Sequence, residues 1–218
     1  MKLNNLWDGL KRIGNGDYVL EGDLICEEDL VIELDDRLVV TGKIMAKMGI
    51  EARCGIEAGR GIKAGRGIKA GNSIKAGDGI KAGCDIEAGY GIEAGYGIEA
   101  GWGIEAGCDI EAGMGIEAGD GIKAGMDIKA GCGIKAGDGI EAGYGIEAKT
   151  FIHSEKRIFA GISIYHTSEN CTKTIKCAEL RKGEICFGDL VIEEPVTEMT
   201  VAQNEEKLGI KNLKIKCQ

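Results

Sequence analysis

The sequence predicts an all-β fold, a parallel β-solenoid in which many short strands stack into a rod. Isoleucine recurs at every sixth position from Ile44 to Ile164, within the consensus GIxAGx. Side chains spaced six residues apart would point to different sides of an α-helix and would not form an apolar stripe, so this pattern excludes an amphipathic helix. Strict short repeats are typical of solenoids. Each repeat has one Ile and one Ala to bury, so stability must come from stacking.

Each repeat predicts a three-residue strand, Ile-Glu/Lys-Ala, followed by a corner, Gly-x-Gly. Alternation along the strand sends Ile and Ala to the interior and the charged residue to solvent. We expect the two glycines to supply the positive φ values of a tight corner. The corner residue x is Arg60, Asp78, Tyr90, Trp102 or Met114 in different repeats, a set that suits only a solvent-facing position.

The predicted cross-section is a flattened, two-sheet coil of about 12 residues, or two repeats. Triangular hexapeptide coils have a small inward residue where this chain has x. Cys84, Cys108 and Cys132 also recur at a spacing that suits two repeats per coil. The alternative is a triangular coil of three repeats. In its favour, Glu and Lys neighbours are opposite in charge somewhat more often at the spacing of three repeats.

The chain is expected to have three segments. Residues 1–23 form an N-terminal cap with a short amphipathic helix, because five apolar residues have helical spacing. These are Leu3, Leu6, Trp7, Leu10 and Ile13. Residues 24–164 form the solenoid, which begins with irregular rungs of larger side chains. Residues 165–218 form a small β-rich C-terminal cap and a candidate oligomerisation contact, because an uncovered solenoid end promotes aggregation.

The composition indicates a soluble protein of the cytoplasm. The chain has 218 residues, 37 glycines, one proline and a net charge of −9. We expect no contact with a membrane, because there is no long apolar run and the first residues lack a signal-peptide core. Nine cysteines without a CxxC pair favour free thiols in a reducing compartment. We expect no cofactor and no bound metal.

The outward charges of the repeats come in blocks along the sequence. No basic residue lies between Lys81 and Lys123, whereas this stretch holds six outward glutamates. With two repeats per coil, Glu87, Glu99 and Glu111 would form one column of like charges, which is unfavourable on a sheet face. A chain selected only to stack would alternate its charges, so the acidic belt indicates a binding surface. The competing interpretation is that duplication copied the charges in blocks.

The acidic belt also carries exposed apolar corner residues. In a coil of two repeats, Tyr90, Trp102, Met114 and Met126 would share one edge, and such stripes are typical of interaction surfaces. The predicted partner-binding residues are Asp85, Glu87, Tyr90, Glu93, Tyr96, Glu99, Trp102, Glu105, Asp109, Glu111, Met114, Glu117 and Asp120. The expected partner is a basic protein, and a nucleic-acid-binding enzyme is the favoured class. Direct nucleic-acid binding is not expected from an acidic chain.

The repeat region resembles β-solenoid hexapeptide-repeat proteins, although the corner residue departs from the pattern of the triangular acyltransferases. Resemblance to those enzymes implies a general-base histidine, but neither His153 nor His166 lies in a long loop that breaks the repeat. We therefore expect no enzymatic activity. The chain is also similar to bactofilins, which implies a self-assembling rod, as a homodimer or a filament. In its acidity it resembles pentapeptide-repeat proteins that imitate nucleic acid and phage-encoded inhibitors of host defence, which implies inhibition of such an enzyme.

Overall fold

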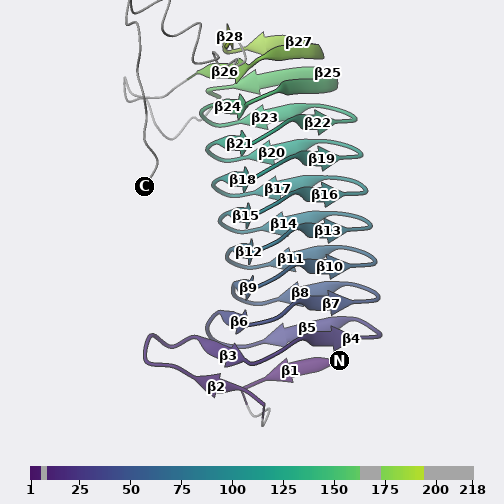
Figure 1. The fold of residues 1–218 in the computed structure, drawn as a ribbon, viewed down its shortest axis with the longest axis vertical. Helices are drawn as coiled ribbons and strands as arrows, with labels where there is room; N and C mark the ends of the chain where they lie inside the picture. Colours follow the sequence, from purple (N-terminus) through teal and green to yellow (C-terminus); the bar gives the residue numbers. More distant parts are fainter. Residues whose placement is uncertain (6–8, 163–172, 194–218) are drawn as a thin grey trace, which may run out of the picture.

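The computed structural model describes residues 1–5, 9–162 and 173–193. It is an all-β parallel β-solenoid of about nine turns, and its described part contains no helix (Figure 1). Each coil contributes three short strands, one to each of three faces, which we name A, B and C in chain order. The corner that leads into a face takes the same letter.

The strands of each face have the following bounds. Face A contains β4 (Leu24–Cys26), β7 (Ile44–Ala46), β10 (Ile62–Ala64), β13 (Ile80–Ala82), β16 (Ile98–Ala100), β19 (Ile116–Ala118) and β22 (Ile134–Ala136). Face B contains β1 (Lys2–Asn4), β5 (Leu30–Glu33), β8 (Ile50–Ala52), β11 (Ile68–Ala70), β14 (Ile86–Ala88), β17 (Ile104–Ala106), β20 (Ile122–Ala124) and β23 (Ile140–Ala142). Face C contains β2 (Lys11–Arg12), β3 (Tyr18–Leu20), β6 (Leu38–Val40), β9 (Ile56–Ala58), β12 (Ile74–Ala76), β15 (Ile92–Ala94), β18 (Ile110–Ala112), β21 (Ile128–Ala130), β24 (Ile146–Ala148), β26 (Thr174–Cys177) and β28 (Asp189–Ile192).

Two longer strands, β25 (Phe151–Ala160) and β27 (Glu179–Phe187), run across the corner between faces A and B. Strand β25 pairs with both β22 and β23. Hydrogen bonding therefore joins faces A and B into one 17-stranded sheet, and face C forms a separate 11-stranded sheet.

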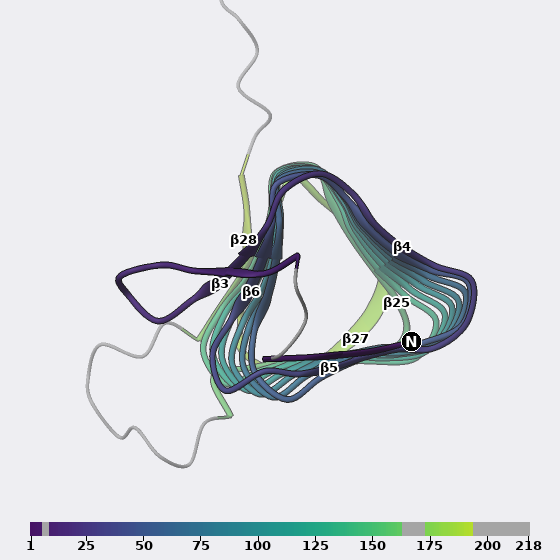
Figure 2. The same cartoon turned by 90° about the horizontal axis from the view of Figure 1, so that it is seen from below.

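The coil contains about 18 residues, so the predicted flattened coil of about 12 residues is wrong. Ile62 pairs in register with Ile80, and Ile74 pairs with Ile92. Seen along its axis, the rod has a triangular outline (Figure 2). The prediction assumed that a triangular coil needs a small inward residue at x. Here the backbone turns at each Gly-x-Gly with x on the outside, so that requirement does not apply.

The core is a stack of Ile and Ala side chains. The repeat isoleucines from Ile44 to Ile158 are at most 2% exposed, and the repeat alanines at most 7%. The intervening Glu and Lys side chains are half-buried or exposed. This confirms the predicted inward and outward positions of the rung.

The glycines of the repeat serve close packing, and the predicted positive φ values are wrong. Positive φ occurs at Gly16, Gly22, Gly161, Gly183 and Gly188, all outside the regular corners. The glycine after each strand, which we name the post-strand position, lies against the coil below. From Gly59 to Gly137 a Cβ there would lie 1.8 to 2.3 Å from a carbonyl oxygen of that coil. The position before each strand, the pre-strand position, is less crowded except at Gly133, where the Phe151 ring lies close. In other coils this position holds Ser73, Asp85, Asp109 or Asp127 in place of glycine.

The N-terminal end is closed by β-structure, and the predicted helix is wrong for the residues that the structure describes. Strand β1 pairs with β5, which buries Leu3 completely, and Leu10 packs against the core. The side chains of Leu6 and Trp7 lie outside the described residues. The first coil is longer, because Leu30 pairs with Ile50 and two extra residues precede β6.

The described part of the C-terminal segment continues the stack. Strand β26 pairs in parallel with β24, β28 with β26, and β27 with β25. Ile164, His166, Cys171 and the stretch 194–218 lie outside the described residues.

Candidate functional site

The corner residues form three columns, because a coil of three repeats returns to the same corner after 18 residues. Corner A holds Arg60, Asp78, Tyr96, Met114, Cys132 and Thr150, each linked to the next by a backbone hydrogen bond. Corner B holds Arg66, Cys84, Trp102 and Asp120, and corner C holds Asn72, Tyr90, Cys108 and Met126, linked in the same way. The predicted stripe of Tyr90, Trp102, Met114 and Met126 on one edge is therefore wrong. The three aromatic residues instead lie on three different corners.

The aromatic corner residues form a girdle around the rod. Tyr90, Tyr96 and Trp102 occupy successive corners C, A and B, and they are 58%, 57% and 56% exposed. Met114, at corner A, is 49% exposed. We use the name acidic girdle for this ring together with the carboxylates between Asp85 and Asp120.

The outward charges mostly face opposite charges on neighbouring coils. The predicted column of Glu87, Glu99 and Glu111 is wrong, because these residues lie on faces B, A and C respectively. Between β8 and β24, four register pairs join like charges. These are Lys63 with Lys81, Glu87 with Glu105, Glu93 with Glu111 and Glu99 with Glu117. Every other register pair of charged outward residues in these strands joins opposite charges.

Four girdle glutamates form ion pairs with lysines outside the girdle. The Nζ to carboxylate distances are 2.7 Å for Lys69 and Glu87, 2.9 Å for Lys75 and Glu93, 2.6 Å for Lys81 and Glu99, and 2.6 Å for Lys135 and Glu117. The hydrogen bonds to these glutamates raise the pKa of Lys69, Lys75 and Lys135. All four pairs are exposed, so each contributes little to stability.

The carboxylates of Glu105, Glu111 and Asp120 make no ion pair with the residues that the structure describes. They belong to face B, face C and corner B. Among the predicted site residues, these three keep the most unneutralised charge, and Trp102 lies in the same coil as Glu105 and directly below Asp120.

Two of the predicted site residues have a structural role that the sequence argument missed. The carboxylate of Asp85 accepts a hydrogen bond from the Gly103 amide at 2.8 Å, and that of Asp109 accepts one from the Asp127 amide at 2.9 Å. Asp127 does the same for Gly145 at 2.8 Å. In each case an aspartate at a pre-strand position binds the pre-strand amide of the next coil. The signal available in the sequence was aspartate in place of the second glycine of the corner.

Two shallow grooves run along the rod beside corners A and B. Where the pre-strand residue is glycine, no side chain fills the space between the stacked corner residues and the stacked outward Glu and Lys residues of the adjoining face. Groove A, of about 760 Å³, has Gly61, Gly79, Gly97, Gly115 and Gly133 on its floor. Groove B, of about 950 Å³, has Gly103, Gly121 and Gly139 there. At corner C the equivalent column is interrupted by Ser73, Asp109 and Asp127.

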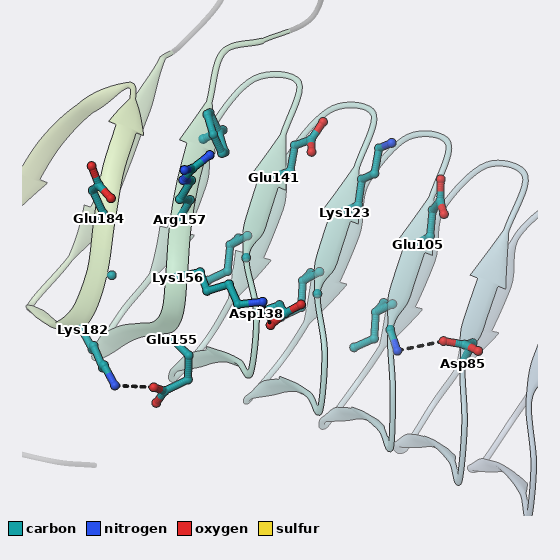
Figure 3. A pocket seen from close by; sticks show the side chains of 18 of the residues that line it. Asp85, Glu105, Lys123, Asp138, Glu141, Glu155, Lys156, Arg157, Lys182 and Glu184 are labelled. Atoms are coloured by element: carbon teal, nitrogen blue, oxygen red, sulfur yellow. Dashed lines mark hydrogen bonds and ion pairs between the residues drawn. The ribbon is translucent and has the colours of Figure 1, made fainter.

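Groove B is lined by charges of both signs (Figure 3). Lys123 lies between Glu105 and Glu141 in one column. Near its C-terminal end Lys156 pairs with Asp138 at 2.7 Å, and Lys182 pairs with Glu155. Glu155 also contacts His153, and its pKa is lowered by Lys182 and then by His153.

Groove A is more apolar at its C-terminal end and basic at its N-terminal end. The ring of Phe151 covers Gly133, and Arg181 stacks over that ring at 3.7 Å. At the other end the groove is lined by Lys43, Arg60, Lys63 and Lys81, by Asp78, and by Glu99, which pairs with Lys81 at 2.6 Å.

No group of three or more His, Cys, Asp or Glu side chains could hold a metal ion within the described ranges. Nor do those ranges contain a helix that could cross a membrane. Cys84, Cys108 and Cys132 are free thiols at three different corners.

Comparison with protein-family models, with curated proteins and with solved structures gives no match to this chain.

Proposed function

We propose that this protein is a non-enzymatic binding rod whose acidic girdle docks on a basic protein and inhibits it. A nucleic-acid-binding enzyme is the class of partner that fits best. The observation that carries the proposal is the coincidence of two features. No basic residue occurs from 82 to 122, which is about two coils, and within this stretch three successive corner residues, one on each corner column, are exposed aromatic residues.

Trp102 with Glu105 and Asp120 is the proposed centre of the contact. Trp102 is large and 56% exposed, and tryptophan is enriched among residues that dominate binding energy. An arginine or lysine of the partner could stack on the indole while its neighbours pair with the two free carboxylates. Because Glu87, Glu93, Glu99 and Glu117 already pair with lysines of this chain, we assign them a weaker role.

The stacking of the coils supports the imitation of a polyanion. Carboxylates on successive coils repeat at about 4.8 Å, so the girdle presents regularly spaced negative charge on a rigid frame. A basic cleft that holds nucleic acid would be attracted by this field over a distance, and association would be fast and sensitive to salt.

The test compares two double charge reversals. Glu105→Lys with Glu111→Lys changes the girdle, and Glu141→Lys with Glu147→Lys is the matched control, because both pairs adjoin Lys123 and Lys129 in the same columns. Proteins captured from the source cell by the wild type should be lost with the girdle variant and Trp102→Ala, but kept with the control. The captured protein should also lose nucleic-acid binding when the rod is added. Equal capture by girdle and control variants would contradict the proposal.

The second candidate function is a self-assembling rod, and one observation favours it. Leu190 and Ile192 are in register with the buried core residues Ile175 and Cys177, yet they are 41% and 53% exposed. No strand within the described residues covers them, so this end of the stack resembles an unfinished rung. Light scattering and negative-stain microscopy at low salt distinguish a filament from a monodisperse particle. A monodisperse monomer or dimer would exclude filaments.

A further inference from the structure

The floor of groove A carries a row of backbone donors. The amides of Gly79, Gly97, Gly115 and Gly133 have no hydrogen-bond partner in the part of the chain that the structure describes. Each lies next to the pre-strand glycine of the coil below; a Cβ built on Gly61, for example, would lie 3.0 Å from the Gly79 carbonyl oxygen and 4.0 Å from its nitrogen. Each missing side chain therefore leaves a slot that faces an amide.

The chain itself shows which chemical group fills such a slot. At corners B and C the aspartates at the pre-strand position place a carboxylate oxygen 2.8 to 2.9 Å from the next amide. The first coil repeats the arrangement, because Asp29 accepts from the Gly49 amide at 2.8 Å and Asp23 from the Lys43 amide at 3.0 Å. A carboxylate is thus the acceptor used at the equivalent position on all three corners.

The slot at Gly61 is also flanked by cations. Arg60 precedes Gly61 and Lys63 follows it by two residues, and both line groove A. Neither makes an ion pair with the described residues. Lys63 faces Lys81 in register, and because Lys81 already pairs with Glu99 at 2.6 Å, Lys63 is the one of the two that keeps its charge unpaired among the described residues. Asp78 also lies beside this slot, because a Cβ built on Gly61 would be 4.0 Å from the Asp78 Cβ. The next slots lack a pair of cations, because Asp78 precedes Gly79, and Tyr96 and Glu99 flank Gly97.

We propose that the Gly61 slot binds the carboxylate of an external ligand. One carboxylate oxygen accepts from the Gly79 amide, and the charge is balanced by Arg60 and Lys63. This site lies outside the acidic girdle and does not depend on the proposed function. The carboxylate can belong to a small organic acid or to an acidic side chain of a peptide, and the groove continues over several coils for the rest of a peptide.

The test is a titration of the ¹⁵N-labelled full-length chain, followed by amide chemical shifts. The probes are glutarate, an acetylated and amidated Gly-Glu-Gly-Glu peptide, and a tetrauridylate. We expect a saturable downfield shift of the Gly79 amide with glutarate or the peptide. The amides of Gly103, Asp127 and Gly145 should not move, because each already binds an aspartate of this chain. Stronger binding of the peptide would identify an acidic protein segment as the ligand, and equal binding a small acid.

Two variants make the test specific. Gly61→Asp should fill the slot with a carboxylate of the chain itself, shift the Gly79 amide without any ligand and abolish the titration. Gly121→Asp, in groove B, is the matched control and should leave the titration unchanged. If Gly61→Asp does not fold by circular dichroism, Arg60→Gln with Lys63→Gln should raise the dissociation constant about tenfold. The proposal is overturned if Gly79 does not respond, if all corner amides respond alike, or if tetrauridylate binds better than the carboxylates.

Discussion

The two glycines of one corner should respond in opposite ways to the same substitution, alanine. At Gly119, a post-strand position, a Cβ would lie 2.0 Å from the Gly101 carbonyl oxygen, so the coils must separate by more than about 1 Å to restore contact distance. That movement would break the backbone bonds from Gly119 to Ala100 and from Asp120 to Trp102, which are 3.1 and 3.0 Å long. At about 1 kcal/mol for each bond and about 1 to 3 kcal/mol for overpacking, Gly119→Ala should cost about 3 to 5 kcal/mol.

The control is Gly121→Ala, on the other side of Asp120. Its Cβ would lie 3.5 Å from the Gly139 carbonyl oxygen, an ordinary contact, and its φ lies outside the left-handed region. Alanine there should be neutral or stabilise by about 0.4 to 1 kcal/mol, because it restricts the unfolded chain. In urea unfolding followed by far-ultraviolet circular dichroism, the midpoint of Gly119→Ala should be about 1 to 2 M below that of the wild type, whereas the midpoint of Gly121→Ala should not fall. Equal midpoints for the two variants would refute the close-approach explanation of the repeat glycines.

Three further predictions concern the core, the corners and the ion pairs. Ile98→Ala, at a position 1% exposed, should destabilise the rod by about 2 to 5 kcal/mol and Ile98→Val by about 0.5 to 1.5 kcal/mol, measured by the same urea assay; similar small costs for both would contradict a close-packed core. Asp109→Ala removes an acceptor from a backbone amide and should cost about 1 kcal/mol, whereas Asp120→Ala should change the free energy of unfolding by less than about 0.5 kcal/mol. The pKa of Lys135 is raised above 10.5 by its hydrogen bond to Glu117, so its contribution to stability is fully present below pH 10.5 and is lost as the pH rises through the folded-state pKa. The stability difference between the wild type and Lys135→Gln should therefore be constant from pH 7 to 10 and shrink above 10.5; a difference unchanged at pH 12 would show that the pair contributes nothing.

The sequence predicted the rung correctly because the rung is local. Ile and Ala are buried and the residue between them is exposed wherever the consensus holds, as alternation along a strand requires. The number of rungs per coil is not local, since it depends on how far the backbone turns at Gly-x-Gly. The useful signal was the pairing of opposite charges three repeats apart, as between Lys69 and Glu87. The recurrence of Cys84, Cys108 and Cys132 indicates a different coil length, but these side chains do not share a corner.

The arrangement of the candidate site depends on the number of rungs per coil for the same reason. The residues of the acidic girdle are close in sequence, so any coil length would place them in the same part of the rod. Which of them are neighbours in space, however, depends on the coil length. With 18 residues per coil, Tyr90 and Trp102 occupy different corners, and Glu87 and Glu93 find lysine partners on the coil below. The roles of Asp85 and Asp109 at backbone amides also depend on which residue lies one coil away, so the sequence alone could not assign them.

Because each coil is made of three hexapeptides, the length of the rod can change in steps of one hexapeptide or in steps of one whole coil. Adding or removing one hexapeptide would leave every Ile above another Ile, so the interior would tolerate the change. All later side chains would, however, rotate by one face relative to the earlier ones. The glycine floor of groove A below the insertion would then meet a different corner above it, and ion pairs across the junction would change partners. Only steps of eighteen residues lengthen the rod while keeping its surface columns continuous. Selection for stacking alone would allow chain lengths that differ by six residues. Selection for a surface would allow only differences of eighteen residues. The differences in length among related chains would therefore distinguish the two kinds of selection.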